Sequence, residues 1–462
     1  MKTSVAVCLT LMLGFAGSIM NAQSPGSAQP PRNATPEVVS HLTKVHGVQL
    51  LQTFNPPPID AWCRDNFGIT CYSPQEIRNA YGVTSILDAG YTGAGQTIII
   101  IDSFGSPTIA EDLKTFDAGY GLPDPPSFTV LAPLGTVPFS PNNAVQVGWA
   151  FEATLDVEWA HAMAPDANIV LLTSPVAETQ GVQGMPEFLY LEQYALDHTP
   201  GKIISQSWSA TENTLFTPAG QKVFADFEAF YQSAAQQNVT VLAAAGDQGS
   251  TGPELNGTTY YPFPVVGFPA SSPFVTAVGG TSLFATESGN YQFEITWNDE
   301  PLVTGGRESA GGGGVSQQFS EPHYQLALPA SVQQILQNHR GLPDVAYNAD
   351  FETLITIYLS FLGPQFAGYY TVGGTSEGSP QWAGIIADAN QLAGHPLGFL
   401  NPQLYAIGAS GMQSQFFHDI TFGSNAGVAG VPGYSATVGW DFTTGWGTPK
   451  VDKLVWELAK QQ

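Results

Sequence analysis

The chain has 462 residues, which is enough for one large α/β domain or two smaller ones. Only 11% of the residues are charged, and the net charge of −25 arises because 13 Lys and Arg face 38 Asp and Glu. This shortage of basic residues excludes a nucleic-acid partner. In acid, 13 Lys and Arg with 8 His carry at most 21 positive charges, so self-repulsion stays mild. We therefore expect adaptation to an acidic medium.

Residues 1–22 have the pattern of a secretory signal peptide. Lys2 supplies the charged start, an apolar stretch runs from Val5 to Ala16, and Ala22 is a suitable cleavage position. The apolar stretch is too short to cross a bilayer, and no later segment is long enough. We expect a secreted protein, or a periplasmic one in a bacterial host, without a membrane anchor.

Residues 23–71 are expected to form a polar, Pro-rich extension, and 72–462 one large domain. Cys8 leaves with the signal peptide, so Cys63 and Cys71 remain. Two cysteines eight positions apart in an exported protein predict a small disulfide loop.

Strand and helix patterns alternate along the domain. Ser73 and Glu76 open a short helix. Runs rich in β-branched residues predict buried parallel strands at 96–102, 168–172, 202–205 and 239–244. Helical patterns lie between them at 151–162, 185–197 and 222–236. This alternation predicts a doubly wound, mostly parallel sheet with helices on both faces.

Ser376 is the candidate nucleophile. Gly373, Gly374 and Thr375 allow a sharp turn before it, and Pro380 fits the first turn of a following helix. The hydroxyl would then lie at a helix N-terminus, where partial positive charge favours an oxyanion. Residues 374–378 also match the G-x-S-x-G elbow of lipases and esterases. The alternative is an ordinary serine N-cap.

Glu152 and Asp156 are four positions apart in the predicted helix 151–162, so they share a face, and both fall in its first turns. Two carboxyls held together tend to share one proton. Such a pair can act as a general base toward Ser376 near ordinary carboxyl pKa values. Alternatively, the two acids complement the helix dipole.

Asp247 ends the apolar run 239–244 and is flanked by Gly246 and Gly249. A carboxyl at the carboxyl end of a parallel strand points toward the expected site. A protonated Asp247 could donate a hydrogen bond to an oxyanion. The alternative is a turn-stabilising aspartate.

Several separated motifs resemble those of the sedolisins, serine-carboxyl peptidases with a subtilisin-like fold. The motifs are 80–83 (AYGV), 155–158 (LDVE), 244–249 (AAGDQG), 268–273 (FPASSP), 276–281 (TAVGGT), 312–316 (GGGVS), 340–346 (RGLPDVA) and 372–384 (VGGTSEGSPQWAG). The resemblance covers about 72–462. It implies a single subtilisin-like catalytic domain.

The resemblance also implies a secreted, acid-active endopeptidase, a monomer that cleaves polypeptides through an acyl-enzyme. By this resemblance, Ser376 is the nucleophile, Glu152 is the base and Asp156 is the acid that shares a proton with Glu152. Asp247 binds the oxyanion. Asp102 and Trp208 resemble outer residues that extend the carboxyl network in some members. Gly312, Gly313 and Gly314 resemble the segment against which substrate backbone lies, where glycines permit close approach.

The family also has a calcium site near its C-terminus. In this chain the resemblance implies calcium ligands from the carboxylates of Asp419 and Asp441 and from the carbonyls of Ile420, Thr437 and Gly439. Oxygen ligands of this kind suit a hard cation. Relatives often have Gly at the position of Thr437, a change that a carbonyl ligand tolerates.

One departure from the family concerns the N-terminus. Members usually carry a long prodomain, whereas only about fifty residues of this chain separate the signal from the catalytic domain. Three explanations are open. The chain folds without a prodomain, a separate chain supplies the prodomain, or the protein is an inactive relative that serves as a binding protein.

Two histidine-based triads can also be drawn from the sequence. A triad of Asp102, His161 and Ser376 has the subtilisin order, but His161 lies nine residues beyond Glu152, roughly 13 Å along a helix. A lipase-like triad would use Asp388 and His395, on or just beyond the helix that Ser376 starts. Neither explains Glu152, Asp156 and Asp247 together.

Overall fold

The computed structural model describes residues 57–299 and 309–460. The predicted signal peptide and residues 23–56 of the predicted extension lie outside the described residues. Within the described part, no helix combines the length and apolarity needed to cross a membrane.

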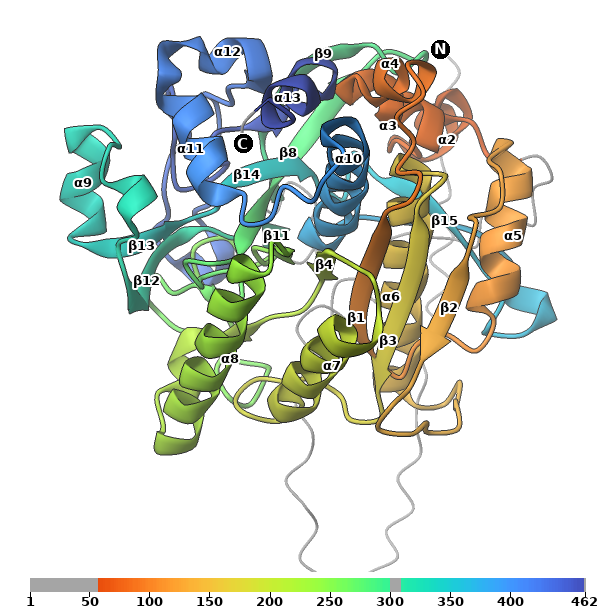
Figure 1. The fold of residues 1–462 in the computed structure, drawn as a ribbon, viewed down its shortest axis with the longest axis horizontal. Coiled ribbons are helices and arrows are strands. Elements are labelled where there is room, and N and C mark those ends of the chain that lie inside the picture. Colours follow the sequence, from red (N-terminus) through yellow and green to blue (C-terminus); the bar gives the residue numbers. More distant parts are fainter. Residues whose placement is uncertain (1–56, 300–308, 461–462) are drawn as a thin grey trace, which may run out of the picture. The chain divides into compact units, whose positions relative to one another are not determined.

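A mostly parallel sheet forms the centre of the domain (Figure 1). Among the described residues it has eight strands, of which only β9 runs antiparallel, beside β8. In spatial order the strands are β14 (Val345–Asn348), β8 (Thr276–Ala285), β6 (Thr240–Ala244), β4 (Ile203–Gln206), β1 (Thr97–Ser103), β3 (Asn168–Ser174) and β2 (Phe128–Leu131), with β9 (Tyr291–Thr296) off this path. The four predicted strands are all present, each within two residues of its expected ends. The predicted α/β class is confirmed.

Alternate residues of the strands belong to two separate hydrophobic cores. Ile98 and Ile100 of β1 belong to a cluster with α6 (Ala144–Met163) and α10 (Gly378–Ala393). Ile99 and Ile101 belong to a second cluster with α7 (Met185–His198) and α8 (Pro218–Gln236). Successive side chains of a strand point to opposite faces, so helices cover both faces, as predicted (Figure 1).

Shorter elements complete the fold. The remaining α-helices are α2 (Asp60–Phe67), α3 (Pro74–Tyr81), α4 (Val83–Asp88), α5 (Ile109–Tyr120), α9 (Ala330–Leu336), α11 (Asn401–Ile407), α12 (Gln413–Phe416) and α13 (Val451–Leu458). Two-stranded pairs are β5 (Ala210–Thr211) with β7 (Gly267–Phe268), β10 (Asn298–Asp299) with β11 (Ser309–Ala310), β12 (Gly314–Ser320) with β13 (His339–Leu342), β15 (Ile355–Leu359) with β16 (Gly368–Val372), and β17 (Phe417–His418) with β18 (Thr448–Pro449). Helix α3 begins at the predicted position, and the structure shows that Ser73 and Glu76 form a capping box there.

Helix α2 lies inside the segment that the sequence assigns to the extension. The predicted disulfide between Cys63 and Cys71 is present and closes the loop after this helix. The carboxyl of Asp60 accepts a hydrogen bond from the Cys71 N–H at 3.1 Å. The Thr70 N–H donates to the Glu352 carbonyl at 3.0 Å, so this segment is bonded to the domain before residue 72.

Helix α6 is longer than predicted. It starts at Ala144 because the Asn143 side chain accepts hydrogen bonds from the backbone N–H groups of Val145 and Gln146, which caps the helix. Glu152 and Asp156 therefore lie in the middle of a 20-residue helix, and their placement in its first turns was wrong. The dipole explanation loses its basis, since that effect falls off within the first turn.

Helices α6 and α10 pack closely where Gly384 faces α6. A Cβ at Gly384 would lie 2.5 Å from the Met163 Cβ and 3.0 Å from the Ala160 carbonyl oxygen. This contact sets the distance between α6, which carries Glu152 and Asp156, and α10, which follows Ser376.

Candidate active site

Ser376 lies in a short 3₁₀ turn, η4 (Thr375–Glu377), directly before α10. Gly374 leads into this turn with φ of 122°, and a Cβ there would lie 2.8 Å from the Asp247 Oδ2, so a glycine is required. Gly374 and Glu377 are the N-cap residues of η4 and α10, and neither cap involves a side-chain hydrogen bond. Ser376 is therefore not an N-cap, and its side chain remains available for chemistry.

Glu152 and Asp156 lie on α6 and are fully buried. Burial raises the pKa of both carboxyls well above the ordinary range. The charge of Asp156 adds to this effect on the pKa of Glu152, and Asp102 adds to it for both acids. The three carboxyls thus form one electrostatically coupled group that favours a shared proton.

Ser207, which follows β4, connects the turn that contains Ser376 with the acid pair of Glu152 and Asp156. The Ser207 hydroxyl lies 2.9 Å from the Asp156 Oδ1 and 3.2 Å from the Ser376 carbonyl oxygen. A hydrogen-bond interaction with Ser376 lowers the pKa of Glu152, against the larger effect of burial. Neither oxygen of Glu152 has a partner with standard hydrogen-bond geometry among the described residues, so this contact is loose. Catalytic hydrogen bonds are often long before substrate binds.

Asp247 follows β6 and lies against the same turn. Its Oδ1 accepts hydrogen bonds from the Thr375 N–H at 2.8 Å and from the Thr375 hydroxyl at 2.7 Å. The Thr375 hydroxyl in turn accepts from the Gly246 N–H at 3.1 Å. The N–H and the hydroxyl of Thr375 thus both donate to Oδ1, while Oδ2 is the Asp247 oxygen on the side of Gly374. The carboxyl is therefore oriented by the residue directly before Ser376.

Asp102 and Trp208 occupy different surroundings. Asp102 lies at the carboxyl end of β1, fully buried, and burial raises its pKa to about 8. Neither of its carboxyl oxygens has a hydrogen-bond partner in 57–299 and 309–460. The Trp208 ring packs against Phe188 and Phe227, and its Nε1 lacks a hydrogen-bond partner within the same residues. The structure thus brings Asp102 to the acid pair and places Trp208 in the neighbouring core.

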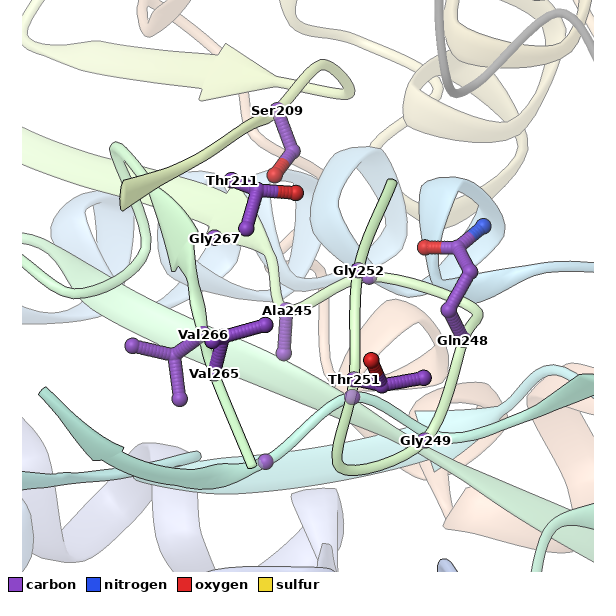
Figure 2. Close-up of a pocket in the computed structure, with 13 residues that line it drawn as sticks. Ser209, Thr211, Ala245, Gln248, Gly249, Thr251, Gly252, Val265, Val266 and Gly267 are labelled. Atoms are coloured by element: carbon purple, nitrogen blue, oxygen red, sulfur yellow. The ribbon is translucent and has the colours of Figure 1, made fainter. Parts of the chain in front are cut away.

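Gly312, Gly313 and Gly314 run past the carboxyl end of β6. The Gly312 N–H donates to the Gly246 carbonyl at 2.7 Å, and a Cβ at Gly312 would lie 2.1 Å from the Ala245 carbonyl oxygen. Gly314 opens β12 with φ of 151°. A pocket of about 250 Å³, including its open mouth, lies between this segment and the 245–252 loop (Figure 2).

The residues of the predicted calcium site gather around one turn near the C-terminus. Both oxygens of Asp419 lie 3.1 Å from the Gly439 N–H, and the Asp441 Oδ2 accepts from the Thr437 N–H at 2.8 Å. The described residues contain no group of three or more His, Cys, Asp or Glu side chains that could hold a metal. A cation here would depend on two carboxylates and on backbone carbonyls, and this all-oxygen donor set fits Ca²⁺.

The histidines of the alternative triads have other partners. His161 Nε2 lies 2.8 Å from the Pro123 carbonyl oxygen and 3.3 Å from the Asp117 Oδ1. Asp388 lies on α10 itself, and His395 follows that helix, exposed, with its Nδ1 3.1 Å from the Pro396 carbonyl. Neither histidine has a recorded contact with Ser376, so the arrangement favours carboxyl chemistry over imidazole chemistry.

Sequence reasoning missed Ser207 and Thr375. Ser207 lies two residues beyond the predicted strand 202–205 and directly after β4, at the sheet edge where Asp102 and Asp247 also lie. This position was the available signal. Thr375 adjoins Ser376, but nothing in the sequence shows that its N–H and hydroxyl both bind Asp247.

Several known proteins resemble this chain in sequence. No family model matches the chain. Kumamolisin of a Bacillus species is 36% identical over 384 residues, covering 82% of this chain and 62% of that protein. Sedolisin of a Pseudomonas species is 29% identical over 395 residues, covering 83% and 60%. The chain thus spans about three-fifths of the length of these curated relatives.

The solved structure of Pseudomonas sedolisin, a serine-carboxyl proteinase complexed with two molecules of pseudo-iodotyrostatin, shares the fold. Its TM-score is 0.69 at 28% identity, with 84% of this chain and 98% of that chain covered. The chain therefore belongs to the sedolisin family.

Proposed function

We propose that the chain is a serine-type endopeptidase in which buried carboxyls take the place of a catalytic histidine. The observation that carries this proposal is the set of hydrogen bonds that joins the turn containing Ser376 to the acids. Ser207 bridges the nucleophile turn to Asp156, and Thr375 binds Asp247 directly before the nucleophile. The relatives named kumamolisin and sedolisin support a peptidase role.

In the proposed reaction, Glu152 takes the proton of the Ser376 hydroxyl as the oxygen attacks the substrate carbonyl. Asp156 shares a proton with Glu152, which keeps the buried pair at one negative charge. A protonated Asp247 and the Ser376 N–H donate to the oxyanion. Glu152 then gives its proton to the leaving amine, and water releases the acyl group by the same steps.

This chemistry requires acid, because Asp247 donates only when protonated and the acid pair needs one proton as well. Ordinary carboxyl pKa values of about 4 place the optimum near pH 3–5. Burial raises the pKa of Glu152 and Asp156, so the pair takes up its second proton at a higher pH than ordinary carboxyls do. Because the doubly protonated pair cannot act as a base, the acidic limit of activity should move toward higher pH.

The test is cleavage of denatured casein by the purified protein across pH 2–8. We expect a maximum in acid that disappears in the Ser376→Ala variant. A maximum near pH 8 that depends on His161 would support a histidine-based triad instead. Absence of cleavage at every pH would support the alternative of an inactive relative that acts as a binding protein.

Three further properties belong to the proposal: secretion of a monomer, a catalytic domain over 72–462, and one Ca²⁺ held by Asp419, Ile420, Thr437, Gly439 and Asp441. A bound Ca²⁺ would fix the C-terminal turn by neutralising its two carboxylates. Chelation should lower the melting temperature of the wild-type protein, and Asp419→Asn should remove this response. An equal response in both proteins would contradict the site.

A further inference from the structure

The turn that contains Ser376 is hydrogen-bonded on both of its sides. Before Ser376, Thr375 donates to Asp247, which follows β6. After Ser376, the Glu377 Oε1 accepts a hydrogen bond from the Asn348 Nδ2 at 2.7 Å, and Asn348 is the last residue of β14. Strands β6 and β14 both pair with β8 in parallel. The turn is thus attached to the ends of two strands through the residues on either side of Ser376.

Asn348 presents its side-chain amide to Glu377 in a fixed orientation. Its Oδ1 accepts hydrogen bonds from the Leu283 N–H at 3.0 Å and from the Thr353 hydroxyl at 2.7 Å. Because a backbone N–H can only donate, the atom bonded to Leu283 is the amide oxygen, and Nδ2 faces Glu377. The Glu377 Oε1 is therefore an acceptor, so a proton on this carboxyl resides on Oε2.

Glu377 is a fully buried acid, and its Oε2 has no hydrogen-bond partner within residues 57–299 and 309–460. Helix α6, which packs against the same turn, adds two further acids, and β8 carries no titratable side chain. The titratable groups that face Glu377 from other elements are therefore acids or tyrosines, namely Asp247, Asp350, Tyr81, Tyr347, Glu152 and Asp156.

These surroundings favour the neutral form of Glu377. Burial raises the pKa of Glu377 well above its ordinary value, and the charges of Asp247 and Asp350 add to this effect, while the Asn348 hydrogen bond opposes it. The N-terminus of α10 also favours a negative charge, but that effect is small beside the cost of burying an anion without a counter-charge. The protonated carboxyl keeps the Asn348 hydrogen bond at no such cost.

Ionisation of Glu377 favours a conformation in which water reaches its carboxylate. The residue belongs to a three-residue turn, so local opening of this turn is the smallest movement that exposes the charge. In the open turn Glu377 has an ordinary pKa of about 4.3. Its contribution to the closed turn is therefore complete below about pH 4 and is lost as the pH rises toward the raised pKa of the closed form.

We propose that Glu377 is a positioning residue whose neutral carboxyl anchors the Ser376 turn to β14 and whose ionisation releases that turn as the pH rises. The anchor itself does not depend on peptidase activity. Its consequence, loss of the position of the nucleophile outside acid, rests on the proposed function.

The experiment measures hydrogen exchange of the full-length protein by mass spectrometry at several pH values from 4 to 7.5. It follows the backbone amides of residues 373–384, with rates divided by those of the same peptide unfolded at the same pH. In the wild type we expect protection to fall by about tenfold per pH unit over the interval in which only the open turn is ionised. The β1 amides should lose less protection than this segment.

Three variants give the signature of the anchor. Glu377→Gln cannot ionise and keeps the oxygen that accepts from Asn348, so at pH 7.5 its segment should be about tenfold or more better protected than that of the wild type. Glu377→Ala lacks the acceptor and should be weakly protected at pH 4 as well. Glu192→Gln is the matched control, because it removes another fully buried acid, on α7, and should leave the wild-type pattern in place.

The proposal is wrong if Glu377→Gln loses protection with pH as the wild type does, or if Glu377→Ala is as well protected as the wild type at pH 4. Should Glu377→Gln not fold, the wild type alone decides, since an equal loss of protection in 373–384 and in β1 would also overturn the anchor. Casein cleavage in acid without the exchange pattern removes the anchor and keeps the peptidase. The exchange pattern without cleavage at any pH does the reverse.

Discussion

Asp344 and Asp156 are both fully buried aspartates, yet their surroundings differ. Asp344 lies 2.6 Å from the equally buried Arg340 guanidinium and accepts hydrogen bonds from the Ala277 N–H and the Tyr405 hydroxyl. Asp156 lies among carboxyls, with Ser207 as its recorded hydrogen-bond donor. A cation neutralises the first carboxyl permanently, whereas only protons can neutralise the second. The difference separates a structural acid from one suited to proton transfer.

The largest expected effect is that of Glu152→Gln, which keeps the shape of the side chain but removes its capacity to take a proton. We expect kcat to fall by about 10³-fold, within the range for a general base, while the melting temperature stays equal or rises. Glu158→Gln is the matched control on the same helix, because Glu158 binds the Tyr358 N–H. Equal losses of activity in both variants would remove Glu152 from its role.

Arg340→Met should act in the opposite way. It leaves Asp344 buried without its cation, which costs about 3–5 kcal/mol of the free energy of unfolding. Activity per folded molecule should be unchanged. Lys222→Met removes the partner of Asp226 in an exposed pair and should cost at most about 1 kcal/mol, measured by urea unfolding. A loss of only that size in Arg340→Met would contradict the contrast between the two sites.

Stability should fall as the pH rises from 4 to 8. Burial raises the pKa of Glu294 and of Glu228 to about 7, and that of Asp102 to about 8. The unfolded chain releases these protons near pH 4, so their contribution is complete below that pH and is lost as the pH approaches the folded-state values. Thermal unfolding should give a higher melting temperature at pH 4 than at pH 7.5, and the reverse order would refute the assignment.

The smallest expected effect is that of Ser207→Ala. The Ser207 hydrogen bond lowers the pKa of Asp156, so its loss should raise that pKa further. The pH–rate profile should shift toward higher pH, and kcat should fall by about tenfold, as the loss of one hydrogen bond to a charged group allows. Ser205→Ala, which removes a buried hydroxyl that contacts Ser379, should leave the profile in place. Identical profiles for the two variants would show that Ser207 does not position the acid.

The main architecture could be predicted from the sequence because buried parallel strands are continuous apolar runs, as in Ile98–Ile101. The candidate residues also could be predicted, since strand ends and the Gly-Gly-Thr-Ser turn mark one edge of the sheet. The start of α6 could not be predicted from the apolar pattern, because it is set by the hydrogen bonds through which Asn143 caps the helix. The role of Ser207 could not be predicted either, since it depends on Asp156 and Ser376, which only folding brings near.

If the proposed activity holds, the close approach of Gly384 to Met163 and Ala160 should make catalysis sensitive to a residue outside the proposed site. A methyl group there would act as a wedge between the helix bearing Glu152 and the helix that Ser376 precedes. A displacement of about 1 Å between reacting groups can cost about a hundredfold in rate. Mutational tolerance should therefore be low along this helix crossing as well as around Ser376, and directed evolution of the protein would encounter a fixed glycine there.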